Sequence, residues 1–137
     1  MSEPHVITRV NPPELGEPPG YAQIVDVGAA RRIIFISGQA ALDRDGRVVG
    51  RDDFAAQAEQ VFRNLAAALS ARGCTPANLA KLTVYLTNME NLAAYREARN
   101  RFFGSISPPA APAVTLVEVS KLYGADLLIE IEAIAVA

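Results

Sequence analysis

The sequence predicts a single α+β domain in which two helices pack on one face of a sheet, in the order β-β-α-β-α-β-β. Several stretches alternate apolar and polar residues with a period of two, which is typical of strands. Two longer stretches repeat apolar residues every three or four positions, which is typical of helices. The 137 residues are enough for one domain with its own core, and they contain no linker, internal repeat or low-complexity tract.

The N-terminal part is predicted to be irregular and then to form a hairpin. Residues 1–20 are expected to be an irregular arm, because four prolines and two glycines lie between positions 11 and 20. Residues 21–27 and 32–37 are runs rich in β-branched residues, separated by the short segment 28–31. Two such runs at this spacing predict an antiparallel hairpin.

The first helix is predicted to begin at Asp52 or Asp53, because an aspartate carboxylate can accept hydrogen bonds from the free N–H groups of a first turn. Its apolar stripe would consist of Phe54, Ala58, Val61, Leu65 and Leu69. Gln57 lies on the opposite side of the helix together with charged and polar residues, and we expect that side to face solvent. Gly73 fits the position that ends the helix.

The chain then continues with residues 81–87 as the third strand and a second helix that Asn88 is expected to cap. That helix should end at Gly104. Residues 107–112, which contain three prolines, are predicted to be a crossing loop, and residues 114–119 are the fourth strand.

The last strand, residues 126–136, is predicted to lie at the centre of the sheet. One set of alternating positions is purely apolar, and it consists of Leu127, Ile129, Ile131, Ala133 and Ala135. The other set carries two carboxylates, Glu130 and Glu132, between apolar ends. Because the two helices cover only one face of the sheet, the acidic face needs another cover.

A bare face with many apolar groups predicts self-association through the sheet, most simply as a closed cyclic ring. In such a ring, Glu130 and Glu132 would lie in or beside a subunit interface, where a small cleft could form.

Composition excludes several classes of function. The net charge of −2 and the absence of a basic run argue against a nucleic-acid binder. No stretch reaches the roughly eighteen apolar residues of a membrane span. No secretory signal is visible at the start, and the single cysteine, Cys74, excludes an internal disulfide, so we expect a cytoplasmic protein. With one histidine and one cysteine, the usual zinc ligands cannot be assembled within one subunit.

Several stretches together resemble the RidA/YjgF family of small trimeric proteins, the reactive intermediate deaminases. The matching stretches are residues 20–21, 36–39, 57–65, 81–86, 112–113, 117–119 and 129–135. Each is a weak motif by itself, but their order and spacing make the combination specific. The match spans roughly residues 20–137.

This resemblance implies a chorismate-mutase-like α+β fold and a homotrimer with clefts between neighbouring subunits. It also implies hydrolysis of imines and enamines, such as 2-aminoacrylate, to a 2-keto acid and ammonia, without a metal or cofactor. Glu130 matches the family's pocket acid, which is proposed to position or activate the attacking water. Tyr21 matches the tyrosine that caps the substrate, and Arg96 aligns where the family often has a pocket asparagine.

Three further residues are predicted near the same pocket. The N–H of Gly38 could bind a developing anion, because glycine lets the backbone approach closely. The hydroxyls of Ser37 and Thr115 would lie beside it. Each of these residues also has a purely structural alternative: Gly38 could simply end a strand, and hydroxyls on strands most often bond to the backbone. Glu132 is expected to be structural, bonded to backbone or to a basic partner.

One position departs from the family pattern. In the family an arginine just after Pro-Ala grips the substrate carboxylate through two parallel hydrogen bonds, a geometry that a planar guanidinium provides. Here Val114 follows Pro112 and Ala113. Loss of such a pair could cost several kcal/mol of substrate binding. Arg96 could supply a charge from another direction.

Two hypotheses therefore stand. The first is a cofactor-free imine or enamine deaminase of the RidA type whose small-molecule substrate is altered, because Val114 replaces the gripping arginine. The second is a non-catalytic trimer that uses the same clefts to bind a small metabolite or a partner protein.

Overall fold

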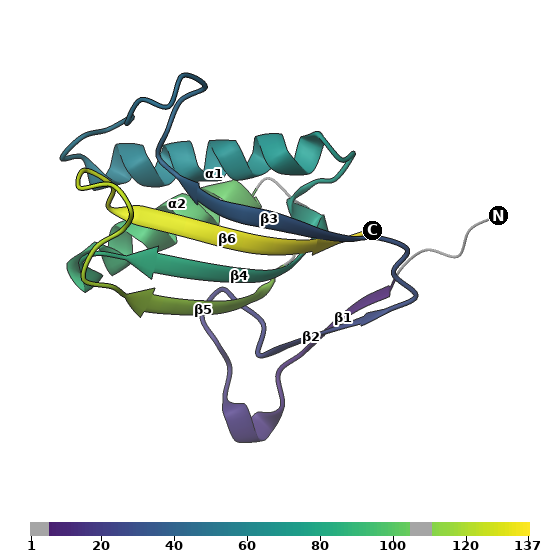
Figure 1. Cartoon of the computed structure of the whole chain (residues 1–137). Helices are drawn as coiled ribbons and strands as arrows, with labels where there is room; N and C mark the ends of the chain where they lie inside the picture. Colours follow the sequence, from purple (N-terminus) through teal and green to yellow (C-terminus); the bar gives the residue numbers. More distant parts are fainter. Residues whose placement is uncertain (1–5, 105–110) are drawn as a thin grey trace.

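The computed structural model describes residues 6–104 and 111–137, and Figure 1 shows the whole chain. The main sheet has four strands in the order β3-β6-β4-β5. Their bounds are Ile33–Ala40 for β3, Leu79–Leu86 for β4, Ala113–Glu118 for β5 and Ile129–Val136 for β6. Strands β4 and β5 are parallel, and the other two pairings are antiparallel. The central place predicted for the last strand is confirmed.

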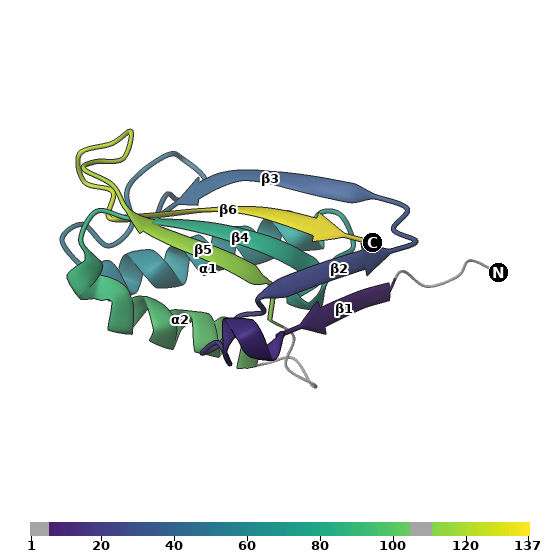
Figure 2. The same cartoon turned by 90° about the horizontal axis from the view of Figure 1, so that it is seen from below.

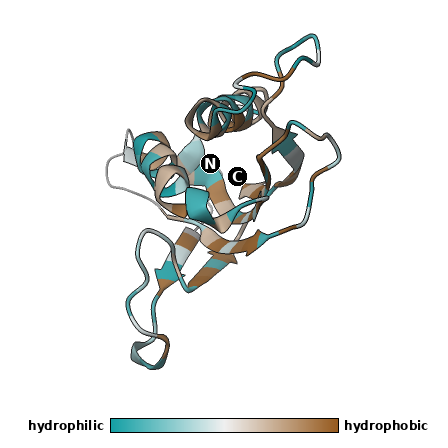
Figure 3. Cartoon of the chain, turned by 90° about the vertical axis from the view of Figure 1, so that its left-hand side faces the viewer, coloured by the Kyte–Doolittle hydropathy of each residue, from teal (hydrophilic) through white to brown (hydrophobic). Residues whose placement is uncertain are grey.

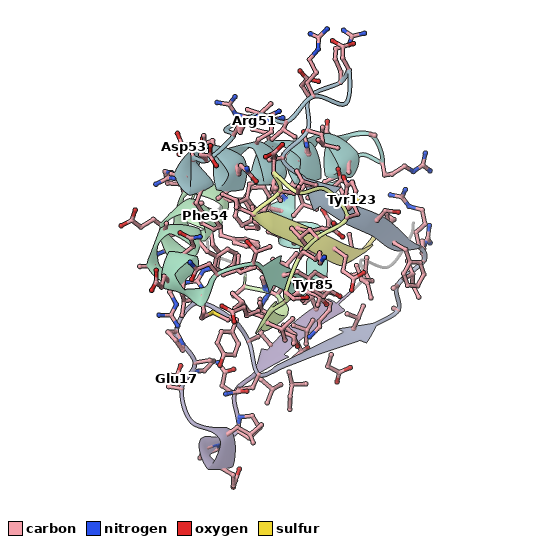
Figure 4. All side chains as sticks on the ribbon, turned by 60° about the vertical axis from the view of Figure 1, so that its left-hand side comes forward. Glu17, Arg51, Asp53, Phe54, Tyr85 and Tyr123 are labelled. Atoms are coloured by element: carbon pink, nitrogen blue, oxygen red, sulfur yellow. The ribbon has the colours of Figure 1, made fainter. Side chains whose placement is uncertain are left out.

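Both helices cover the same face of this sheet, as Figures 2 and 3 show. Helix α1 spans Phe54–Ser70 and helix α2 spans Leu92–Gly104. Asp53 is the N-cap of α1, and its carboxylate accepts a hydrogen bond from Ala56 N at 3.1 Å. Figure 4 shows Asp53 and Phe54 at this end of α1. Asn88 caps a short 3₁₀ helix, Met89–Asn91, that leads directly into α2.

The core lies between the sheet and the helices. The predicted apolar stripe of α1 and the alternating apolar set of β6 are buried in it. It also contains Leu82, Val84 and Leu86 of β4 and Tyr95, Ala98 and Phe103 of α2. The α+β fold with two helices on one sheet face is thereby confirmed.

Gln57 is a correction to the predicted helix pattern, because its side chain is fully buried rather than on the solvent side. Its amide nitrogen donates to Gly50 O at 3.1 Å and Asp126 O at 2.8 Å, and its amide oxygen accepts from Leu128 N at 2.9 Å. A buried polar group needs such partners. Gln57 therefore ties α1 to the loops beside β3 and β6.

The predicted hairpin is also wrong. Strand β2, Ile24–Gly28, pairs with β1, Val6–Val10, to form a separate two-stranded sheet. Residues 6–10 of the predicted irregular arm are therefore a strand. Strand β3 pairs instead with β6, and Arg31 N and Arg32 N extend this pairing by donating to Ala137 O.

The two-stranded sheet joins the rest of the molecule beside the start of β5. Ala22 forms a parallel bridge with Ala113, and its N–H donates to Pro112 O at 2.9 Å. This contact fixes the segment before β2, including Tyr21, next to the end of β5 that begins with Ala113. Residues 107–110 of the predicted crossing loop lie outside the described part of the chain.

The other face of the main sheet carries no helix, and we call it the open face. Phe35 is 77% exposed there and Ile33 is 62% exposed, both on the edge strand β3. Polar residues occupy the middle of the face, among them Lys81, Thr83 and Tyr85 of β4. None of the helices in the described part of the chain is long and apolar enough to cross a membrane.

Candidate functional site

Glu130 projects from the centre of the open face and lies directly against Gly38. A side chain at position 38 would collide with the Glu130 carboxylate, so glycine lets the carboxylate keep this position. The regular pairing of β3 with β6 shifts between Ile36 and Gln39, which is the segment that contains Gly38. This irregularity re-aims the backbone beside the carboxylate.

The pKa of Glu130 is raised above its ordinary value. Burial is the larger cause, and the negative charge of Glu132 on the same face adds to it. A carboxyl group with a raised pKa can both accept and release a proton closer to neutrality than a free carboxylate can.

Glu132 has a different environment. It is exposed, and it accepts a hydrogen bond from the hydroxyl of Tyr85 at 2.9 Å. Its partner is therefore a tyrosine, not the backbone or basic group that we expected. This hydrogen bond is the main reason that the pKa of Tyr85 is raised. Figure 4 labels Tyr85 on β4.

Ser37 and Thr115 also lie on the open face. Ser37 is exposed and lines a hollow of about 260 Å³ together with Phe35, Lys81, Thr83, Glu132 and Ile134. Thr115 accepts a hydrogen bond from the ammonium group of Lys81 at 2.7 Å. Glu130, Gly38, Ser37 and Thr115 all lie on the open face, and we call them together the open-face cluster; Thr115 on β5 is separated from the other three by β4.

The other predicted residues lie elsewhere. Tyr21, Arg96 and Val114 line a second cavity of about 340 Å³, which we call the helix-side pocket. Its remaining lining residues are Pro19, Met89, Leu92, Tyr95, Arg99 and Leu116. Val114 and Leu116 pack toward the core side of β5, whereas Thr115 points to the open face. Within one chain, the sheet therefore separates the two groups.

Two residues of the helix-side pocket were missed by the sequence reasoning. Arg99 is 7% exposed, and Tyr95 is 1% exposed with a buried hydroxyl that has no hydrogen-bond partner among the described residues. A signal for them existed, since Tyr95, Arg96 and Arg99 are spaced to share one face of a helix. Across residues 6–104 and 111–137, no group of three or more His, Cys, Asp or Glu side chains is placed to hold a metal ion.

Comparison with known proteins decides the family. A family model described as Endoribonuclease L-PSP matches residues 16–137. A RutC family protein of Pyrococcus abyssi is 33% identical over 135 residues, which cover 98% of each chain. The chain belongs to the RidA/YjgF family. The resemblance found in the sequence motifs is thereby confirmed.

Two other members of the RidA/YjgF family support the assignment. A protein of Salmonella typhimurium named 2-iminobutanoate/2-iminopropanoate deaminase is 34% identical over 116 residues, with 85% of this chain and 86% of that protein covered. The crystal structure of YyfB from Yersinia pestis, titled as a Rid family protein of unknown function, has a TM-score of 0.82 and 31% identity. That match covers 96% of this chain and 98% of YyfB.

Proposed function

We propose that this RidA/YjgF protein is a cofactor-free hydrolase that releases ammonia from imine and enamine metabolites. The observation that carries the proposal is the half-buried Glu130 carboxyl group, held against Gly38 with a raised pKa. The name of the Salmonella relative supports this class of reaction.

The reaction needs proton transfers that one carboxyl group can supply. Glu130 takes a proton from water as the water oxygen attacks the imine carbon, and it passes that proton to the imine nitrogen, which gives a neutral carbinolamine. Glu130 then takes the proton of the new hydroxyl group and passes it to the nitrogen as the carbon–nitrogen bond breaks, so that one imine and one water give one ketone and one ammonia. A pKa raised toward neutrality suits a group that plays both roles.

We further propose that the complete site forms between two copies of the chain in a closed homotrimer. The open-face cluster holds the proton-transfer group, and the helix-side pocket holds the residues suited to grip a substrate. Because these groups are separated by the sheet in one chain, a neighbouring copy would bring its pocket against this chain's Glu130. Head-to-tail contacts that close into a ring permit such an arrangement.

Val114 makes the substrate differ from the simplest 2-imino acids. The valine side chain offers no donor or charge, so the strand wall of the pocket is apolar where the family has an arginine. We expect weak acceleration of the hydrolysis of 2-iminopropanoate and 2-iminobutanoate, since these small anions gain little from an apolar wall.

The test is an assay in which an amino-acid oxidase generates imines in situ and their disappearance is followed. A panel that extends from alanine to leucine and phenylalanine as oxidase substrates would cover small, branched and aromatic imines. We expect the wild type to accelerate hydrolysis of a larger imine, and Glu130→Gln to lose that acceleration while keeping its oligomeric state. Unchanged hydrolysis by Glu130→Gln would remove this residue from the mechanism.

Gly38→Ala gives a second variant, because its methyl group would displace the Glu130 carboxylate without changing its charge. We expect a loss of at least about tenfold in kcat/KM, as for other displaced catalytic groups. Gly28→Ala is the matched control, since its Cβ would meet no heavy atom within 4 Å. If the wild type hydrolyses no imine of the panel, the chain is a binding protein and the proposal is wrong.

A further inference from the structure

Arg99 is a buried cation without a counter-ion in the described structure. Its guanidinium donates to the Asn100 side-chain oxygen at 3.3 Å from Nε and 3.1 Å from Nη2. No carboxylate of residues 6–104 and 111–137 pairs with it, because the ion pairs in that part of the chain involve Arg51 and Arg101. A guanidinium has five N–H donors, so most of its capacity is unused. A buried charge without an anion is costly.

Tyr95 presents a second unsatisfied group in the same place. Its hydroxyl is buried and has no partner among the described residues. Burial raises the pKa of Tyr95 to about 12, although the charges of Arg99 and Arg96 act in the opposite direction. The Arg99 guanidinium carbon lies 5.9 Å from the centre of the Tyr95 ring. The guanidinium therefore lies over the face of the Tyr95 ring, and an anion in the pocket would satisfy its unused donors.

The helix-side pocket, which Arg99 lines, also has an apolar part. Met89, Leu92, Val114 and Leu116 supply aliphatic surface to its wall. The backbone of Gly20, with φ of +79°, packs on the guanidinium so closely that a side chain there would clash with it. The arm before β2 therefore holds Arg99 in place.

We propose that the helix-side pocket binds a monocarboxylate with an apolar body, and that Arg99 grips its carboxylate. Arg96 adds positive charge, and the apolar body lies against Val114 and Leu116. In the family, the arginine that grips the carboxylate lies on the strand. Here the positive charge comes from Arg99 on helix α2. The identity of this ligand as a bulky 2-imino acid substrate rests on the proposed function, whereas the binding does not.

The test uses a matched pair of stable ligands, phenylacetate and phenylacetamide, with the full chain and isothermal titration calorimetry. The two have the same shape, and only the first is an anion. We expect phenylacetate to bind at least about tenfold more tightly, because hydrogen bonds to charged groups are the stronger ones. Equal affinity for the two ligands, or no binding of phenylacetate, would overturn the proposal.

Variants locate the site. We expect Arg99→Gln to weaken phenylacetate binding at least about tenfold, and Arg99→Lys to give an intermediate affinity, because lysine keeps the charge but lacks the planar fork. Arg101→Gln is the matched control on the same helix, where the arginine is exposed and pairs with Glu59. Unchanged binding by Arg99→Gln would overturn the assignment.

Arg99→Lys also separates ligand binding from folding. If Arg99→Gln does not fold, Arg99→Lys and the ligand pair still decide the question, because lysine keeps the charge without the planar fork.

The outcomes also separate this inference from the proposed function. Selective binding of phenylacetate without hydrolysis of any imine would support the pocket and contradict the deaminase. Hydrolysis that depends on Glu130, together with phenylacetate binding that Arg99→Gln leaves unchanged, would support the deaminase and overturn the pocket.

Discussion

At the scale of the residue, two carboxylates on one strand differ because their neighbours differ. Glu132 is exposed and accepts a hydrogen bond from Tyr85. Glu130 is half-buried beside Gly38, and its pKa is raised by burial and by the charge of Glu132. Glu132 therefore has two effects, since it anchors Tyr85 and also makes Glu130 hold its proton more tightly. A carboxyl group whose pKa is raised by burial and by a neighbouring like charge is a candidate for acid–base chemistry.

The raised pKa of Glu130 predicts a specific pH dependence of stability. In the folded chain Glu130 holds its proton more tightly than in the unfolded chain, where the ordinary value is 4.5. Between 4.5 and the raised folded pKa, the unfolded chain has released a proton that the folded chain keeps. Stability therefore falls as pH rises through this window. Glutamine cannot ionise, so Glu130→Gln should lose that decline and be more stable than the wild type near neutrality.

Urea unfolding measured from below pH 4.5 to neutrality checks this prediction. Glu17→Gln is the control, because Glu17 lies on the loop between β1 and β2, away from Tyr85, the β4 residue that lies opposite Glu130 (Figure 4). Parallel stability profiles for Glu130→Gln and the wild type would contradict the environment described for this carboxyl group.

At the scale of the element, helix α1 is fixed to the sheet by more than its apolar stripe. Gln57 bonds three backbone groups, Gly50 O, Asp126 O and Leu128 N, at the two loops beside β3 and β6. The loop at residue 126 leads into β6, which carries Glu130. Gln57 therefore helps to set where the proposed catalytic strand begins.

Gln57→Leu tests this connection. Leucine has a similar volume but leaves the three backbone groups without their partner, and each unsatisfied buried group costs about 1–3 kcal/mol. We expect a loss of about 3 kcal/mol in the free energy of unfolding, measured by urea denaturation. Arg63→Leu on the exposed side of the same helix is the control and should stay within about 0.5 kcal/mol of the wild type. Similar stability of both variants would show that the Gln57 bonds are unimportant.

The same elements show what a sequence can predict. Helix α1 and strand β6 follow from local periodicity, because each repeats its apolar residues over many positions. The pairing of β3 with β6 instead of β2 depends on contacts across about a hundred residues, which local patterns do not encode. Gln57 and Arg99 are polar residues whose burial depends on specific partners or on a cavity. Periodicity assigns such residues to solvent, so this part of the site could only come from the structure.

At the scale of the whole molecule, the uncovered sheet face determines how the chain can work. Phe35 and Ile33 expose large apolar surfaces on β3, which is also an edge strand of the sheet. Monomeric proteins rarely leave such a combination uncovered, since both apolar patches and free strand edges promote association. In the homotrimer that we propose, a second copy covers this face and brings the two separated groups of site residues together.

Phe35→Asp tests the whole arrangement. We expect the wild type to be a trimer by light scattering, and the variant to be a monomer because a carboxylate cannot be buried in an apolar contact without a partner. Leu15→Asp, at an exposed position on the loop between β1 and β2, is the control and should remain a trimer. A stable wild-type monomer at micromolar concentration would contradict the prediction. Because the helix-side pocket is built from one chain, the Phe35→Asp monomer should lose imine hydrolysis but still bind phenylacetate.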